Sequence, residues 1–131
     1  MNMYLLIASC LTLILALAHS VLGELKIFKH LKDEGLPVVQ GIPMMWKTDG
    51  FAKRTIRFVW HVTSIFGIGF ASVLAYFSHL PSLSVTDIAV VKIIAGAMLL
   101  SGLVTVLLSK GSHLGWVLFF AVGVFCMLAV M

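Results

Sequence analysis

Charged side chains are scarce in this sequence. Lysine and arginine number nine, aspartate and glutamate number five, and together they make up 11% of the 131 residues. Hydrophobic residues account for 61%, and the mean hydropathy is +1.13. A soluble domain of this length cannot hide so much apolar surface from water. The composition therefore favours an integral membrane protein.

Ionisable side chains are also missing from the centre of every long apolar segment. A bilayer crossing takes about 20 mostly apolar residues. Four segments reach or approach that length, at residues 3–23, 56–78, 86–108 and 113–131. Ion pumps and proton-coupled carriers usually place acidic or basic groups at mid-membrane depth. Their absence argues against transport driven by an intramembrane carboxylate.

Short connections between the later segments predict the fold class. Residues 79–85 separate the second and third segments, and residues 109–112 separate the third and fourth. Segments joined by such short loops are expected to be antiparallel neighbours. The stretch SVTD at 84–87 fits a capping box that starts the third helix. We therefore expect a single all-α domain over 1–131, an integral membrane four-helix bundle with up-down topology.

The sequence contains only two cysteines. Cys10 and Cys126 lie inside apolar segments without a CxxC spacing. We expect them to be small apolar side chains, with no disulfide framework.

No lysine or arginine precedes the first apolar segment, whereas a secretory signal peptide begins with positive charge. We therefore expect that segment to be a retained span.

Basic residues are concentrated between the first two segments, and they predict the orientation. By the positive-inside rule, the 24–55 loop and the 109–112 turn are cytoplasmic and both termini lie outside the cytoplasm. Leu25, Phe28 and Leu31 recur at helical spacing, which predicts an amphipathic start to the loop. The charge lies at a membrane surface, so we expect a lipid bilayer as partner and no nucleic acid. The seven basic residues are Lys26, Lys29, Lys32, Lys47, Lys53, Arg54 and Arg57.

Small and weakly polar residues form a stripe along each of the first three segments. Membrane helices bury such residues against each other, because lipid tails give no reward for burying leucine. We expect these stripes to face inward. They comprise Ala8, Thr12, Ala16, His19 and Gly23; then His61, Ser64, Ile68, Ser72 and Ala75; and then Ala97, Ser101 and Thr105.

Three histidines are predicted to meet at one depth of the bundle. His19 lies near the end of the first segment, His61 near the start of the second, and His113 opens the fourth. Glu24 lies close enough along the chain to reach the same cytoplasmic layer. Imidazole binds zinc, iron and copper, and two histidines across a bundle can hold a haem iron. These four residues are the candidate ligands of a transition metal or a b-type haem.

A basic and aromatic stripe lies beside His61. Arg54 and Arg57 share its helical face, at spacings of three and four residues. That face suits an anionic group such as a haem propionate, a lipid phosphate or the carboxylate of Glu24. Trp60 adds the flat apolar surface that a macrocycle or quinone ring needs, although aromatic residues at this depth are also ordinary interface anchors. Arg54, Arg57 and Trp60 are the candidate cofactor-binding residues.

The same histidines have a structural interpretation. Imidazoles at the end of a span can bond to Ser20, Ser64, Glu24 or backbone carbonyls, and so form a polar layer without any ligand. The sequence contains no convincing nucleophile beside them. No catalytic residue is therefore assigned, and an enzyme is not favoured.

Three stretches carry a resemblance to a known group of proteins: AHSVLGE at 18–24, RFVWHVTS at 57–64 and KGSHLGW at 110–116. The chain resembles a family of uncharacterised small four-span bacterial inner-membrane proteins with AHSxLGE, RFxWHxTS and KGxHxGW segments. The resemblance implies a location in the bacterial inner membrane. It carries no activity over to this chain.

Three functions stay open on these grounds. The favoured hypothesis is a structural or accessory membrane protein, either a subunit of a larger membrane complex or a homo-oligomer. The second is a protein that binds a metal or haem b through the histidines. The third is an enzyme acting on a lipid or quinone head group.

Overall fold

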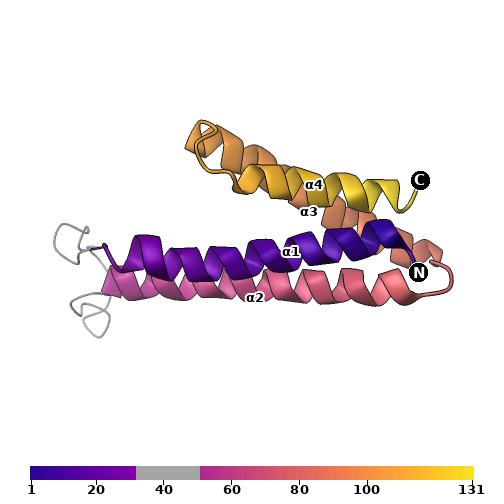
Figure 1. Ribbon diagram of the computed structural model, residues 1–131, viewed down its shortest axis with the longest axis horizontal. Coiled ribbons are helices and arrows are strands. Elements are labelled where there is room, and N and C mark those ends of the chain that lie inside the picture. Colours follow the sequence, from indigo (N-terminus) through magenta and orange to yellow (C-terminus); the bar gives the residue numbers. More distant parts are fainter. Residues whose placement is uncertain (32–50) are drawn as a thin grey trace, which may run out of the picture.

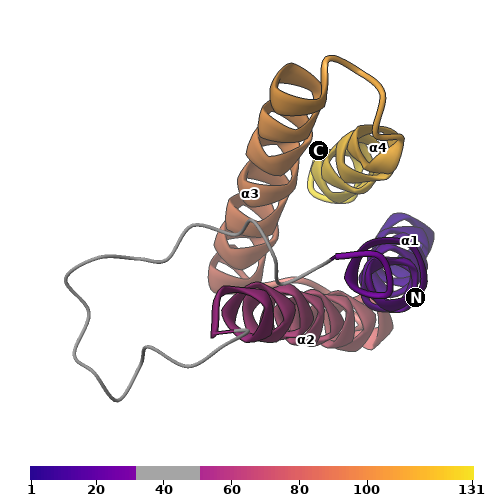
Figure 2. The ribbon, with the colours of Figure 1, turned by 90° about the vertical axis from the view of Figure 1, so that its left-hand side faces the viewer.

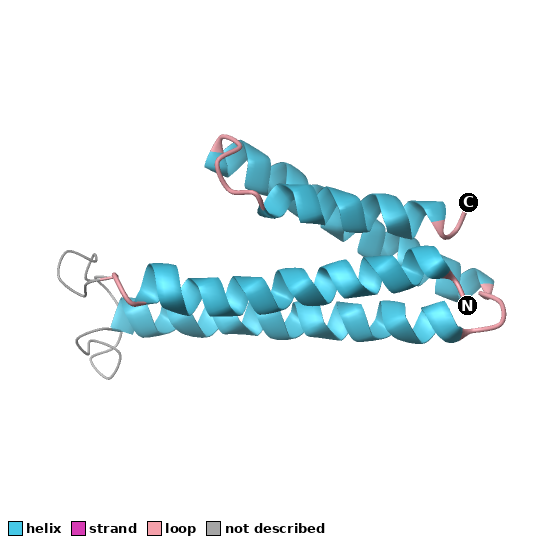
Figure 3. Ribbon diagram, in the orientation of Figure 1, coloured by secondary structure: helices cyan, strands magenta, loops and turns pink. Residues whose placement is uncertain are grey.

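Helices form all the regular structure of the described chain. The computed structural model describes residues 1–31 and 51–131, and within these ranges it contains helices and no strands (Figure 3). The predicted all-α class with four helices is confirmed. The helices are α1 (Met3–Leu22), the short π-helix η1 (Gly23–Phe28), α2 (Phe51–His79), α3 (Val85–Ser109) and α4 (Gly115–Leu128).

The ends of the predicted loop are helical. Its amphipathic start continues α1 as η1, which ends at Phe28. Its last residues belong to α2, which begins at Phe51 rather than at residue 56. The part of the predicted loop at 32–50 lies outside the described residues.

Three helical stretches are long and apolar enough to cross a membrane. They are Met3–Phe28, Phe51–His79 and Val85–Ser109. The chain is therefore a membrane protein whose apolar helices contact lipid. The fourth helix is shorter than the predicted segment 113–131, since α4 has 14 residues. At 1.5 Å per residue it spans about 21 Å of a hydrocarbon core of about 30 Å, so a fourth crossing stays a prediction.

Successive helices run in opposite directions, as an up-down topology requires (Figure 1). Both chain termini and the loop between α2 and α3 lie at one end of the molecule. The η1 segment and the turn between α3 and α4 lie at the other end, which we call the histidine end because it carries His19, His61 and His113. The predicted grouping of the loops is therefore present.

The helices pack as two pairs rather than as a closed ring. α1 packs along α2, α3 packs along α4, and α1 also contacts α4. α2 and α3 meet near the loop that joins them and then diverge (Figures 1 and 2). The expectation that these two helices are lateral neighbours is thus wrong over most of their length. A short loop determines where two helices meet, but not the angle between them.

Asn2 ties three helices together at the terminal end. Its side-chain oxygen accepts hydrogen bonds from the backbone N–H groups of Tyr4 (3.1 Å) and Leu5 (3.3 Å), so it caps α1. Its amide nitrogen donates to the carbonyl of Ala129 (3.1 Å), just beyond α4, and its backbone N–H donates to the carbonyl of Ser78 (2.7 Å) in α2. One residue thus satisfies orphan groups at the ends of all three helices.

The start of α3 follows the predicted capping box. The Ser84 hydroxyl accepts from the backbone N–H of Asp87 (3.2 Å), and the Asp87 carboxylate accepts from the backbone N–H of Ser84 (2.8 Å). Two N–H groups that lack a partner within the helix are satisfied reciprocally. The SVTD stretch therefore marks the helix start correctly.

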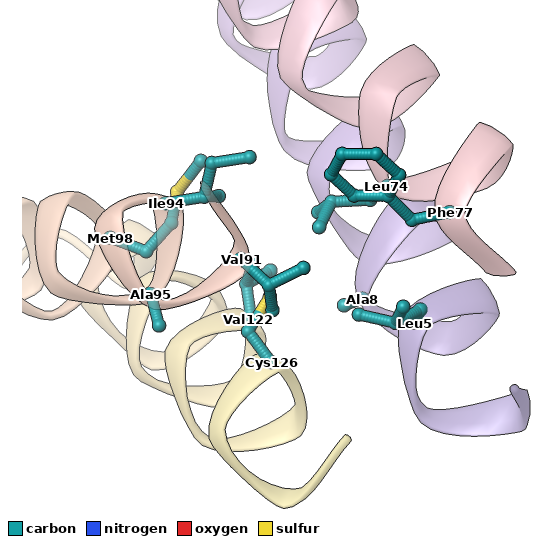
Figure 4. Packing of buried hydrophobic residues seen from close by; sticks show 10 residues of the cluster. All are labelled: Leu5, Ala8, Leu74, Phe77, Val91, Ile94, Ala95, Met98, Val122 and Cys126. Carbon is teal, nitrogen blue, oxygen red and sulfur yellow. The ribbon is translucent and has the colours of Figure 1, made fainter. Parts of the chain in front are cut away.

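The apolar core lies at the terminal end, where the two helix pairs converge. Figure 4 shows buried side chains from all four helices meeting there. Close packing of these chains supplies the dispersion contacts that hold the pairs together. The ten residues drawn are Leu5, Ala8, Leu74, Phe77, Val91, Ile94, Ala95, Met98, Val122 and Cys126.

The inward face of α1 is the predicted one. Ala8, Thr12, Ala16 and Gly23 are buried, and His19 is half-buried. These small side chains let α2 come close. The stripe of small residues therefore predicted the packing face of α1 correctly.

The predicted inward faces of α2 and α3 are partly wrong. On α2, Ser64 is buried as expected, but Ile68 and Ser72 are exposed. The buried face is rotated towards α1: the Ser9 hydroxyl donates to the carbonyl of Ala71 at 2.7 Å. A Cβ added to Gly67 would lie only 2.9 Å from the Cβ of Ala16.

On α3, the predicted stripe borders an open space rather than a helix. Ala97 is exposed, and Ser101 and Thr105 are half-buried. The face of α3 that packs is instead apolar, and includes Val91 and Met98. The divergence of α3 from α2 explains why the small residues of this predicted stripe have no helix to meet, while Ala95 and Gly102 of α3 are buried against α4.

Candidate functional site

A cluster of four polar side chains joins α2 to the end of α1 at the histidine end. Arg57 donates to both carboxylate oxygens of Glu24, from Nε to Oε1 at 2.6 Å and from Nη2 to Oε2 at 2.8 Å. His61 Nε2 lies 2.7 Å from Glu24 Oε1, and its Nδ1 lies 2.8 Å from the Ser20 hydroxyl. We call Ser20, Glu24, Arg57 and His61 the polar cluster.

The hydrogen bonds of the polar cluster assign a role to each ring nitrogen of His61. An ionised carboxylate only accepts, so Nε2 carries a hydrogen and donates to Glu24. In the neutral imidazole, Nδ1 then accepts from the Ser20 hydroxyl. Both ring nitrogens are thus occupied by protein groups, and the bidentate geometry of Arg57 makes its contact with Glu24 a strong one.

The π-helical turn of η1 brings Glu24 and Phe28 onto α2. The backbone N–H of Lys29 donates to the carbonyl of Glu24 at 3.1 Å, five residues back. Such a wide turn shifts the side chains that follow relative to an α-helix. Phe28 is buried with its ring edge against Trp60, at 5.6 Å between centroids and 90° between planes. The start of the predicted loop is therefore anchored to α2.

Gly23 allows the close approach of Trp60. The indole Nε1 donates to the carbonyl of His19 at 2.7 Å. A Cβ at position 23 would overlap the indole ring. Glycine is needed here because α1 and the tryptophan of α2 touch with no space for a side chain.

His19 lies flat against Trp60, outside the polar cluster. The two rings are stacked at 4.1 Å between centroids and 5° between planes. His19 Nε2 lies 3.3 Å from the hydroxyl of Thr63, and that hydroxyl donates to the backbone carbonyl of Trp60 at 2.7 Å. The imidazole is thus held mainly by stacking, with one long hydrogen bond.

His113 lies in the turn between α3 and α4 and is exposed. The turn reverses the chain through Lys110 and Gly111, at φ of 50° and 80°. The backbone N–H of Gly115 donates to His113 Nδ1 at 3.1 Å. Because Nδ1 accepts, the hydrogen of the neutral ring lies on Nε2, for which the described part of the chain supplies no hydrogen-bond partner.

A cavity of about 680 Å³ lies between the two helix pairs, where they diverge. Its lining is mostly apolar, with phenylalanines and small residues on the walls and serine and threonine hydroxyls among them. His19 and His113 both line it, from α1 and from the turn before α4. The cavity and the polar cluster are thus separate features of the histidine end.

The predicted site residues other than Arg54 fall into two groups. Glu24, Arg57 and His61 come together in the polar cluster, while Trp60 packs beside them. His19 and His113 line the cavity instead. Arg54 lies on α2 three residues before Arg57 and is exposed. Of the anionic groups expected to meet the arginine stripe, Glu24 is the one that Arg57 and His61 contact, whereas the three histidines belong to different surroundings.

Metal binding finds no geometric support in the described residues. Within 1–31 and 51–131, no group of three or more histidine, cysteine, aspartate or glutamate side chains is placed to hold a metal ion. Both nitrogens of His61 are engaged with protein groups. The proposed metal and haem sites therefore stay predictions.

Sequence reasoning missed the hydrogen bonds of Trp60 to the His19 carbonyl, of His19 to Thr63 and of Asn2 to the other helices. The hydrogen bond between His19 and Thr63 depends on how α1 and α2 are rotated about their axes. The capping role of Asn2 had a signal in the sequence, since asparagine directly before an apolar helix is a typical N-cap. Its bond to Ala129, at the opposite end of the chain, had none.

Comparison with protein-family models, curated proteins and solved structures finds no significant match to this chain. The resemblance to small four-span inner-membrane proteins therefore stays an expectation.

Proposed function

We propose that this chain is a structural or accessory protein of a bacterial inner membrane, crossing it several times with both termini outside the cytoplasm. Its polar cluster holds α1 and η1 against α2 and does not serve as a reaction centre. The observation that carries this proposal is the position of Glu24, which lies in η1 directly after α1 and binds both Arg57 and His61 of α2.

The saturation of the polar cluster supports the structural role. Both carboxylate oxygens of Glu24 and both ring nitrogens of His61 have a hydrogen-bond partner within the protein. A polar layer with all its partners in place stabilises one arrangement of helices, whereas a reaction centre usually keeps groups free for substrate. The positions of Ser20 and His61 therefore fit a layer that holds α1 and α2 together.

The exposed face of the molecule supports an accessory role. Ile65 of α2 and Ile93 and Leu100 of α3 are more than half exposed. In a membrane these side chains contact lipid or another apolar helix. A small protein with a rigid helix pair and a large apolar exterior suits attachment to a larger membrane complex.

The test combines stability, assembly and cofactor content. The protein is expressed with a tag in a bacterial host, crosslinked in native membranes and purified, together with His61→Ala. We expect the variant to be less stable and to form fewer crosslinks, and the wild-type protein to contain no stoichiometric metal or haem. A Soret band or one equivalent of a transition metal in the wild-type protein, lost in His61→Ala, would overturn the proposal in favour of cofactor binding.

A further inference from the structure

We propose that the cavity between the two helix pairs binds a neutral lipid with a planar, carbonyl-bearing head group, of the isoprenoid quinone class. This goes beyond the structural role proposed above, because the cavity is distinct from the polar cluster. The argument rests on the size of the cavity, the charge of its lining, its hydrogen-bond donors and its position.

The size of the cavity suits a small molecule and not a helix. Ligand cavities usually measure about 300–1,000 Å³, and this one has 680 Å³. A helix about 10 Å wide and about 30 Å long occupies on the order of 2,000 Å³. The cavity is therefore large enough for a small molecule with a slender tail, but not for a whole spanning helix.

The lining contains no formal charge. None of the described residues that border the cavity is a lysine, arginine, aspartate or glutamate. An anionic phospholipid head group would need such a cation for neutralisation, since the cost of placing an unpaired charge in an apolar site is high. An uncharged head group is therefore favoured.

Hydrogen-bond donors at the histidine end fit carbonyl acceptors. The Nε2–H of neutral His113 has no partner in the described part of the chain, and His19 has only its long contact with Thr63. The hydroxyls of Ser101 and Thr105 donate to carbonyls of their own helix, at 2.8 and 2.7 Å. The donors that remain are the His113 imidazole, the Ser109 hydroxyl and the weakly engaged N–H of His19, so the ligand should supply acceptors.

The aromatic surfaces and the depth of the site fit a flat ring with a tail. His19 and Trp60 form a stacked pair, and Phe66, Phe70 and Phe119 line the walls. Flat rings pack well against such faces. The imidazoles lie at the histidine end, whereas Ala97 and Met98 line the cavity further towards the core. A head group beside the histidines would leave its tail in the apolar part.

The binding test uses decylubiquinone as the probe and tryptophan fluorescence as the readout. The full-length protein is placed in phosphatidylcholine nanodiscs and titrated. We expect saturable quenching with one site per chain, since Trp60 stacks on a residue that lines the cavity. Quenching that rises linearly without saturation would overturn the proposal.

Variants then locate the site. Ala97→Phe fills the cavity and should abolish saturable quenching. Ala89→Phe, the same change at an exposed position of α3 away from the cavity, is the matched control and should bind as the wild type. Thr105→Phe is the second blocking variant if Ala97→Phe fails to fold. Unchanged binding in a folded blocking variant would overturn the proposal.

The head-group chemistry is tested separately. His19→Phe keeps a flat ring against Trp60 but removes the N–H, and should weaken binding about tenfold, as expected for one lost hydrogen bond. Dioctanoylglycerol, an uncharged lipid with carbonyls but no planar ring, should not displace the quinone at equal concentration. Displacement by it, or full affinity in His19→Phe, would overturn the assignment to quinones.

Discussion

Single residues determine how closely α1 and α2 approach at the histidine end. Gly23 is the sharpest case, because the indole of Trp60 occupies the space that any side chain would need. The Trp60 hydrogen bond to the carbonyl of His19 also depends on this contact. The sequence shows the glycine at the end of an apolar run, but not the ring that makes it necessary.

We predict that Gly23→Ala destabilises the protein by about 1–3 kcal/mol, because the added methyl group overpacks a tight contact. Gly69→Ala is the matched control. A Cβ at position 69 meets nothing within 4 Å, so this change should be neutral or slightly stabilising. Unfolding of the purified protein in detergent, followed by circular dichroism, measures both. Equal midpoints for the two variants would contradict the described contact.

For the site residues, the sequence indicated which side chains contact each other better than it indicated how the three histidines are arranged. The three- and four-residue spacing of Arg54, Arg57 and His61 identified one face of α2, and Glu24 was among its expected anionic partners. The division of the histidines between two surroundings was not predictable. It depends on the π-helical turn after α1 and on the angle between the helix pairs, and neither has a signal in hydrophobic periodicity.

At the scale of helices, caps at the terminal end do more than begin helices. Asn2 caps α1 and also bonds to Ala129 beyond α4 and to Ser78 in α2. Ser84 caps α3 within its own helix, through Asp87. A comparison of the two caps therefore distinguishes the stability that a cap gives to its own helix from the stability that it gives by joining helices.

We predict that Ser84→Ala costs about 1 kcal/mol of stability, the usual loss for an N-cap. Asn2→Ala should cost more, because it also breaks the bond to Ala129. Unfolding midpoints of both variants in the same detergent give the comparison. If Asn2→Ala proves no more damaging than Ser84→Ala, the bond between the two ends of the chain contributes nothing.

The predicted helices were close to those observed, because long apolar runs and capping signals are local. The third segment, expected at 86–108, is found as Val85–Ser109. The fourth was expected at 113–131 and is shorter, since α4 ends at Leu128. Which faces pack was predictable only for α1. Ala97, Ser101 and Thr105 of α3 border a cavity, because the diverging helix pairs leave them without a neighbouring helix.

At the scale of the whole molecule, the topology brings the histidine-end segments to the same side. The η1 segment and the turn between α3 and α4 lie at one end, and the termini at the other (Figure 1). Basic residues lie near the η1 segment and near the turn between α3 and α4, and they give the orientation that we propose. The described structure and the positive-inside rule thus predict that both termini are accessible from outside the cytoplasm and that the histidine end is not.

We predict that Lys29→Cys and Ser112→Cys are protected from a membrane-impermeant maleimide added to spheroplasts, whereas Met131→Cys is labelled. The native thiols are first removed as Cys10→Ala and Cys126→Ala. Labelling of positions 29 and 112 with protection of position 131 would reverse the orientation. Labelling of only one of positions 29 and 112 would contradict the up-down arrangement.

The central claim is that the polar cluster locks α1 to α2, and a double-mutant cycle tests it most directly. Unfolding midpoints are measured for Glu24→Gln, Arg57→Gln and the double variant, with Lys26→Gln as a control that leaves the midpoint unchanged. The account predicts that each single change lowers the midpoint and that the double variant is little worse than the more damaging single one, because both break the same interaction. Losses that simply add would contradict it.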